Sequence, residues 1–118
     1  MLRILIISLV FTNVAHAFTK NGIVQSCKEN AKGPCYEFPG RARMYHNKYI
    51  RIWKKGSNRL YEITRQTDSA FSDLKHLSMA TEIHATFDVC FLDPEVPSGI
   101  SAICLQSVKN AKTSHMPE

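Results

Sequence analysis

Basic and aromatic side chains alternate through the middle of the chain, and this segment is the first candidate for chemistry. The stretch from Arg41 to Arg65 holds eight basic residues and a single acid, Glu62, in a chain of formal net charge +5. Within it, the residues of interest are Tyr45, Tyr49, Trp53 and Tyr61, interleaved with Arg41, Arg43, Arg51, Lys54, Lys55 and Arg59. Basic groups along a polyanion and aromatic faces under its bases are typical of single-strand binding. The pattern predicts polyanion binding, with binding residues Arg51, Lys54, Lys55 and Arg59.

The same segment has a purely structural interpretation, which we favour from the sequence. Trp53 is the only tryptophan of the chain, and we expect a lone tryptophan in a small domain to lie in the core. Arg51 can stack between Tyr49 and Trp53 at one end of a barrel. We therefore expect a non-catalytic structural or protein-interaction domain. The alternative is a polyanion-binding module for an anionic glycan, a lipid headgroup or single-stranded nucleic acid.

The sequence predicts neither an enzyme nor a metal protein. The histidines stand apart from any nucleophile elbow. His84 and Asp88 would be about 13 Å apart along one strand, too far to pair. No Cys-x-x-Cys pair is present, which argues against a zinc site. We predict no catalytic residues, no metal ligands and no cofactor.

The N-terminus has the layout of a secretory signal peptide. Met1-Leu2-Arg3 supplies a positive charge, residues 4–14 are largely apolar, and Ala15-His16-Ala17 has the small-x-small pattern of a cleavage site. The apolar run is shorter than the roughly 20 residues of a membrane-spanning helix. We predict a signal peptide over 1–17, a single mature domain over 18–118, and a secreted or periplasmic location without a membrane span.

Four cysteines follow the predicted cleavage site: Cys27, Cys35, Cys90 and Cys104. An even number in a small exported domain indicates two disulfides. We favour Cys27–Cys35, which would staple an irregular segment over 18–34, and Cys90–Cys104, which would join neighbouring strands. Directly opposed cysteines need the closer, non-hydrogen-bonded type of strand pair. The sequence does not give the register, so the connectivity stays open.

Alternating apolar and polar residues predict a mainly β fold. Within 49–53, for example, Ile50 and Ile52 should face one way, and Tyr49, Arg51 and Trp53 the other. Strands are expected at 35–45 with an interruption at Pro39-Gly40, 49–53, 59–63, 83–91 and 100–108.

The segment over 67–77 reads as a short helix, with Asp68 or Ser69 as its cap, and 109–118 as a loose tail. This order predicts a five-stranded antiparallel OB-like (oligonucleotide/oligosaccharide-binding) small barrel, with the helix between strands three and four. An SH3-like barrel or an open antiparallel sheet with one helix is the alternative.

Several of these segments resemble a family of small uncharacterised secreted bacterial proteins. The likeness lies in Gly40-Arg41, Arg51-Ile52-Trp53, Gly56 with Arg59, Phe87-Asp88-Val89-Cys90 and Ile103-Cys104. It departs from the family pattern at His46-Asn47-Lys48 and at Leu60-Tyr61. The resemblance implies export and the same strand order, and it implies no activity.

Overall fold

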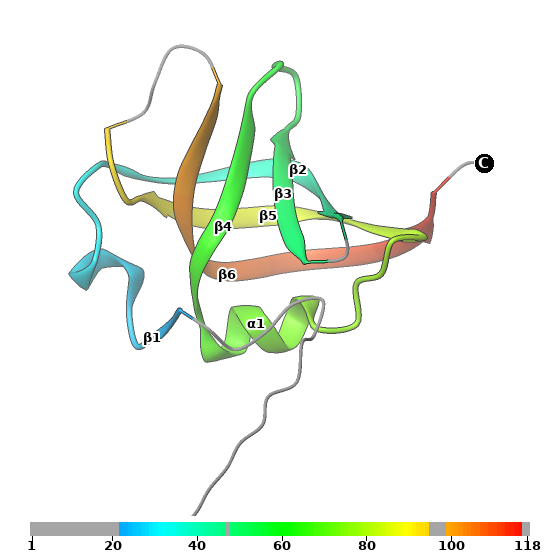
Figure 1. Ribbon diagram of the computed structural model, residues 1–118, viewed down its shortest axis with the longest axis horizontal. Helices are drawn as coiled ribbons and strands as arrows, with labels where there is room; N and C mark the ends of the chain where they lie inside the picture. The colour runs from blue at the N-terminus through cyan, green and yellow to red at the C-terminus, as the bar shows by residue number, and fades with distance from the viewer. Residues whose placement is uncertain (1–21, 47, 95–98, 117–118) are drawn as a thin grey trace, which may run out of the picture.

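The computed structural model describes residues 22–46, 48–94 and 99–116, so the predicted signal peptide lies outside the described residues. Figure 1 shows long strands around a common interior, with one helix below them. In chain order, the elements are β1 (Ile23–Val24), the 3-10 turn η1 (Cys27–Glu29), β2 (Cys35–Tyr45), β3 (Tyr49–Lys54), β4 (Leu60–Thr67), α1 (Asp68–Leu74), β5 (Thr81–Phe91) and β6 (Ile100–His115). The predicted mainly β class and the helix between β4 and β5 are confirmed.

The strands form one mixed sheet that closes into a ring. Its order is β1-β4-β3-β2-β5-β6, and β6 pairs again with β4. The β2-β3-β4 meander is antiparallel, as predicted. The β4–β6 and β1–β4 pairs are parallel, which corrects the prediction of an all-antiparallel sheet. The direction of β4–β6 is forced, because β4 and β6 each lie two antiparallel steps away from β2.

Alternation along the strands separates the interior of the ring from its outer face. Ile50 and Ile52 are buried, whereas Tyr49 is exposed and Arg51 and Trp53 are half-exposed, so the predicted facing of β3 is confirmed. Removal of apolar side chains from water supplies about 25 cal/mol per Å². The largest fully buried side chains include Tyr61, Phe87, Phe91, Leu74, Ile103 and Leu105.

The N-cap of helix α1 lies one residue before Asp68, the earlier of the two predicted caps, so the predicted cap is wrong. Thr67 is the N-cap residue, and its hydroxyl accepts a hydrogen bond from the Ala70 amide at 3.2 Å. Phe71 and Leu74 are buried, and α1 packs against β4 and β6. The helix lies below the strands in Figure 1. No helix of the described segments is long and apolar enough to cross a membrane.

Strand β6 continues through much of the predicted loose tail. Its residues from Lys109 to His115 pair with β5, ending at His115 opposite Thr81, so a loose tail is wrong for this part. Asn110 has a φ of 56°, a left-handed conformation that asparagine tolerates. The register shifts near it, between His84 and Thr86. Asn110 and Ala111 of β6 thus lie opposite the single residue Ala85 of β5, as in a β-bulge, and pairing resumes at Lys112.

Both predicted disulfide pairings are wrong, although two disulfides are present. Cys27 is bonded to Cys104 and Cys35 to Cys90, with Cα–Cα distances of 5.5 Å and 3.9 Å. Cys90 and Cys104 do lie opposite each other on β5 and β6, but Cys90 is also opposite Cys35 on β2. Cys90 therefore has a cysteine neighbour on each side of its strand.

Backbone hydrogen bonds explain the choice of partner. The Phe91 amide donates toward β2, to Pro34 O, and the Leu92 amide donates toward β6, to Ala102 O. Amide directions alternate along a strand, so the Cys90 amide points to β6. The pair with Cys35 is consequently the closer, non-hydrogen-bonded type, which a cross-strand disulfide requires.

Candidate functional site

The four predicted binding residues do not form one cluster. Arg51 lies in the middle of the outer face of β3. Lys54 lies at the end of this strand, with its ammonium 5.7 Å from the centre of the Phe38 ring. Lys55 is exposed in the following turn, and Arg59 is half-buried where that turn leads into β4. The structure therefore places Arg51 on the outer face and the other three at the β3–β4 end.

Trp53 lies on the outer face, and our prediction that it belongs to the core is wrong. Its ring is half-exposed and has the Arg41 guanidinium 4.9 Å from its centre. Its indole Nε1 donates to the Ser57 carbonyl oxygen at 2.6 Å. The inward position at this level of β3 belongs to Ile52, which is fully buried. The period of two therefore outweighs the general tendency of a lone tryptophan to be core.

Gly40 lets β2 and β3 approach closely beside Trp53. Strand β2 runs through Pro39-Gly40 without the predicted interruption. A Cβ atom at position 40 would lie 2.6 Å from the Trp53 carbonyl oxygen. The Lys55 amide donates to the Pro39 carbonyl oxygen at 3.0 Å, which holds the β3–β4 turn against β2. Arg41 follows directly in sequence and is the register partner of Trp53 on β3, so its guanidinium lies over the tryptophan ring.

Two rows of side chains cross the outer face, and the first has no acidic member. We call it the Trp53 row, and it consists of register neighbours on β4, β3, β2, β5 and β6: Leu60, Trp53, Arg41, His84 and Lys112. Its cationic side chains, Arg41 and Lys112, and its histidine extend across the sheet from the tryptophan. Lys55 adds a further exposed cation next to Trp53.

The second row is internally neutralised. We call it the Arg43 row, and it consists of Glu62, Arg51, Arg43 and Glu82 on β4, β3, β2 and β5. Arg43 Nε donates to Glu82 Oε1 at 2.7 Å, and Arg51 Nε donates to Glu62 Oε1 at 3.2 Å. Each arginine of this row thus has a carboxylate partner on the neighbouring strand.

Glu82 is the buried anion beneath these cations. Its side chain is 9% exposed, whereas those of Arg43 and His84 are 26% and 49% exposed. Burial acts to raise the pKa of Glu82, but hydrogen bonds from His84 and Arg43 outweigh it, so the pKa lies below its usual value. The carboxylate is thus covered, and the surface above it presents the cationic groups.

Aromatic rings on and beside this face each hold a cation. Besides Arg41 over Trp53, the Arg51 guanidinium lies 5.2 Å from the centre of the Tyr45 ring. The Lys48 ammonium lies 5.6 Å from the centre of the Tyr49 ring. Lys54 lies over Phe38, but this ring belongs to the core. On the outer face, three rings thus orient three cations.

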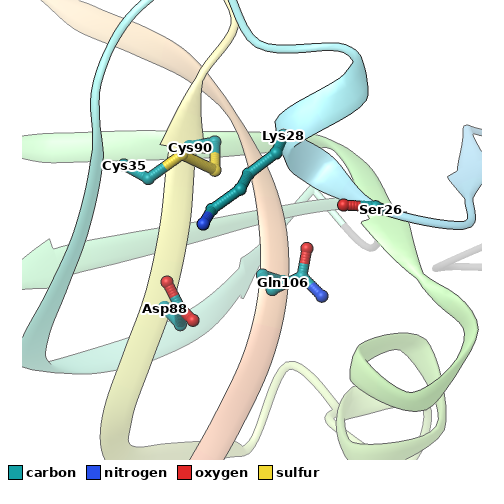
Figure 2. Close-up of a pocket in the computed structure, with 6 residues that line it drawn as sticks. All are labelled: Ser26, Lys28, Cys35, Asp88, Cys90 and Gln106. Carbon is teal, nitrogen blue, oxygen red and sulfur yellow. A yellow bond between two sulfur atoms is a disulfide. The ribbon is translucent and has the colours of Figure 1, made fainter.

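A separate small pocket lies beside the Cys35–Cys90 disulfide. It has a volume of about 330 Å³, and its lining is Ser26, Lys28, Cys35, Asp88, Cys90 and Gln106. Figure 2 shows Lys28 reaching from η1 past the disulfide toward Asp88. The Gln106 side-chain oxygen accepts a hydrogen bond from the Cys27 amide at 2.8 Å. The cysteines here are bonded to each other, so the pocket offers no thiol nucleophile.

Sequence reasoning missed the partners that organise the outer face. His84 pairs with Glu82, with 2.7 Å between Nε2 and Oε2, two residues away on the same strand. Arg43 and Glu82 are 39 residues apart in sequence. Alternation alone could place Glu82 and His84 on one face of β5, but their contact with Arg43 needs the β2–β5 register. Among the described residues, no three His, Cys, Asp or Glu side chains are arranged to hold a metal ion.

No protein-family model, curated protein or solved structure matches this chain.

Proposed function

We propose that this chain is an exported, non-catalytic binding module with an OB-like barrel, and that it binds a polyanion on the outer face of β2, β3 and β4. The OB-like assignment is supported by the closing order of the strands and by the helix between β4 and β5. OB-folds bind oligosaccharides and oligonucleotides on the outer face around their second and third strands. The corresponding strands are β3 and β4, which carry Trp53 and Leu60 of the Trp53 row.

The Trp53 row is the observation that carries this proposal. The structural interpretation of the basic segment expects Trp53 in the core, whereas Trp53 lies on the outer face. Its row joins an aromatic ring to Arg41 and Lys112 without an acid. The carboxylate that lies closest to Arg41, that of Glu82, is buried beneath Arg41 and Arg43. An anionic polymer would therefore meet cations first.

Export is supported by the cysteines and by the N-terminal pattern. Both disulfides are consistent with an oxidising extracellular environment. A non-catalytic role is supported by Glu82, whose lowered pKa keeps it ionised in contact with Arg43 and His84. A carboxylate held in this way suits a structural ion pair better than general acid catalysis.

Salt-dependent binding tests the proposal. We expect a fluorescently labelled heparin fragment to bind at low ionic strength, with an affinity that falls steeply as salt rises because counterions are released. Arg41→Gln and Lys55→Gln should each weaken binding and lower the salt slope by about 1. The matched control is Lys75→Gln, which removes an exposed lysine beside α1 and should leave binding unchanged.

Two results would contradict polyanion binding on this face. One is the absence of binding at low salt to heparin, oligonucleotides and acidic vesicles alike, which would favour the structural or protein-interaction alternative. The other is an equal loss of affinity for Arg41→Gln and Lys75→Gln, which would mean that only overall charge matters. Circular dichroism of each variant checks that its fold is retained.

A further inference from the structure

We infer that the ligand of the outer face is an anionic polysaccharide, recognised by its carboxylate or sulfate groups. This inference rests on the polyanion-binding function proposed above. The ligand class follows from which aromatic rings and which arginines of this face are already engaged within the protein.

The aromatic rings here are occupied by the protein's own cations. Trp53 and Tyr45 each carry a guanidinium, at 4.9 Å and 5.2 Å from the ring centres. Tyr49 carries the Lys48 ammonium at 5.6 Å. A nucleic-acid base that stacked on the same ring face would have to displace the cation and lose its interaction with the ring. The rings therefore serve to orient cations rather than to receive bases.

Arg41 is the cation best placed to hold an anionic group. Its closest carboxylate contact is Glu82, with Nε 3.9 Å from Oε1, which is beyond hydrogen-bond distance. By contrast, Arg43 and Arg51 already donate from Nε to Glu82 and Glu62. A guanidinium stacked on a ring keeps its planar N–H fork available, and that fork matches a carboxylate or sulfate bidentately.

The distribution of apolar side chains argues against a lipid surface as the ligand. Among the residues that the structure describes, the large exposed hydrophobic side chains are Tyr36, Tyr49, Met79 and Ile100. They lie on the start of β2, the start of β3, the segment after α1 and the start of β6. A peripheral membrane contact needs apolar residues gathered on one face. The Trp53 row supplies directed charge without such an apolar cluster.

The test compares anionic probes that carry nucleic-acid bases with anionic probes that carry none. The full mature chain is titrated, by fluorescence anisotropy at low salt, with oligo(dT) and with an abasic deoxyribose-phosphate strand of the same length. Heparin and polygalacturonate fragments supply sulfate and carboxylate groups. We expect both glycans to bind, and the two strands to differ by less than about threefold, because bases add about 1–3 kcal/mol each only where they stack.

A conservative substitution at Arg41 distinguishes the contribution of its planar N–H fork from that of its positive charge. Arg41→Lys keeps the cation and removes the fork, so we expect glycan affinity to fall about tenfold, as for one lost charge-assisted hydrogen bond. Lys75→Arg is the control, because it changes an exposed lysine beside α1, and it should leave binding unchanged. Tryptophan fluorescence reports whether the environment of Trp53 is retained in both variants.

The possible outcomes separate this inference from the function on which it rests. Oligo(dT) binding more than about tenfold tighter than the abasic strand would show that bases stack, overturning the glycan inference while leaving polyanion binding intact. Unchanged glycan affinity in Arg41→Lys would overturn the role of the fork. Failure of every probe to bind would refute the proposed function itself.

Discussion

Trp53 and Phe87 are both large aromatic residues on strands, and they differ in their surroundings. Phe87 is fully buried inside the ring, whereas Trp53 is half-exposed on its outer face. Truncation of a buried phenylalanine to alanine costs about 3–5 kcal/mol. Trp53→Ala loses part of that burial and a cation–π contact, so we expect its free energy of unfolding to fall by only about 1–2 kcal/mol. Urea unfolding of Trp53→Ala and Phe87→Ala measures both, and equal losses would place Trp53 in the core after all.

Glu82 gives the domain a defined response to acid. Its pKa in the folded protein lies below the ordinary value of 4.5, because its bonds to His84 and Arg43 outweigh the effect of burial. The stability that it contributes is therefore present above about pH 4.5 and is lost as the pH falls through the lowered folded value. Glu82→Gln should lower the free energy of unfolding at neutral pH by about 1–3 kcal/mol. It should also flatten this acid limb, as measured by urea unfolding across the pH range.

The control for Glu82 is an exposed ion pair on the same sheet. Glu37 pairs with Lys109, and both side chains are about half-exposed. Water screens exposed pairs, so they contribute little to stability, and Glu37→Gln should change the stability little at any pH. An acid limb in Glu82→Gln as steep as that of the unmodified protein would contradict the assignment to Glu82.

At the scale of elements, the local alternation of residues predicts individual strands and their faces, but it does not predict how the strands pair. The alternation of Ile50 and Ile52 with Arg51 predicted β3 and its two faces correctly. The strand predicted over 100–108 is too short, because the polar residues that follow it are held in β6 by their pairing with β5. The Cys35–Cys90 disulfide and the Arg43–Glu82 contact both depend on the β2–β5 register. The hydrophobic pattern of the two strands limits that register to steps of two residues, but no short turn joins β2 to β5 to fix the choice.

Gly40 is the local feature that controls how closely β2 approaches β3. In Gly40→Ala, the new Cβ would meet the Trp53 carbonyl oxygen at 2.6 Å, a backbone atom that cannot turn away. We expect the strands to separate, with a loss of about 1–3 kcal/mol of stability and a shifted tryptophan emission maximum. Gly56→Asn is the control, because position 56 has open space and a φ of +82°, which asparagine tolerates. A Gly40→Ala protein as stable as this control would contradict close approach at Gly40.

At the scale of the whole molecule, the two disulfides hold different parts of the ring. Cys27–Cys104 ties the N-terminal segment to β6, and Cys35–Cys90 ties β2 to β5. Their partners are 77 and 55 residues apart in sequence. For loops of this length, the chain-entropy model gives about 4 kcal/mol for each bridge. Loop length therefore does not distinguish the two bridges in stability. They differ instead in how accessible they are to a reductant.

The bridges should consequently open in a fixed order. Cys27 and Cys104 are both fully buried, whereas Cys35 is exposed and lines the pocket of Figure 2. A reductant thiolate must reach a sulfur atom in order to attack it, and Cys35 is the one exposed residue among the four bonded cysteines. We expect limiting dithiothreitol to open Cys35–Cys90 first, so that alkylation and peptide mapping label these two cysteines before Cys27 and Cys104. In urea, where burial no longer protects either bridge, the order should disappear. Simultaneous labelling of all four cysteines in the folded protein would contradict this, since it would mean that reduction requires global unfolding.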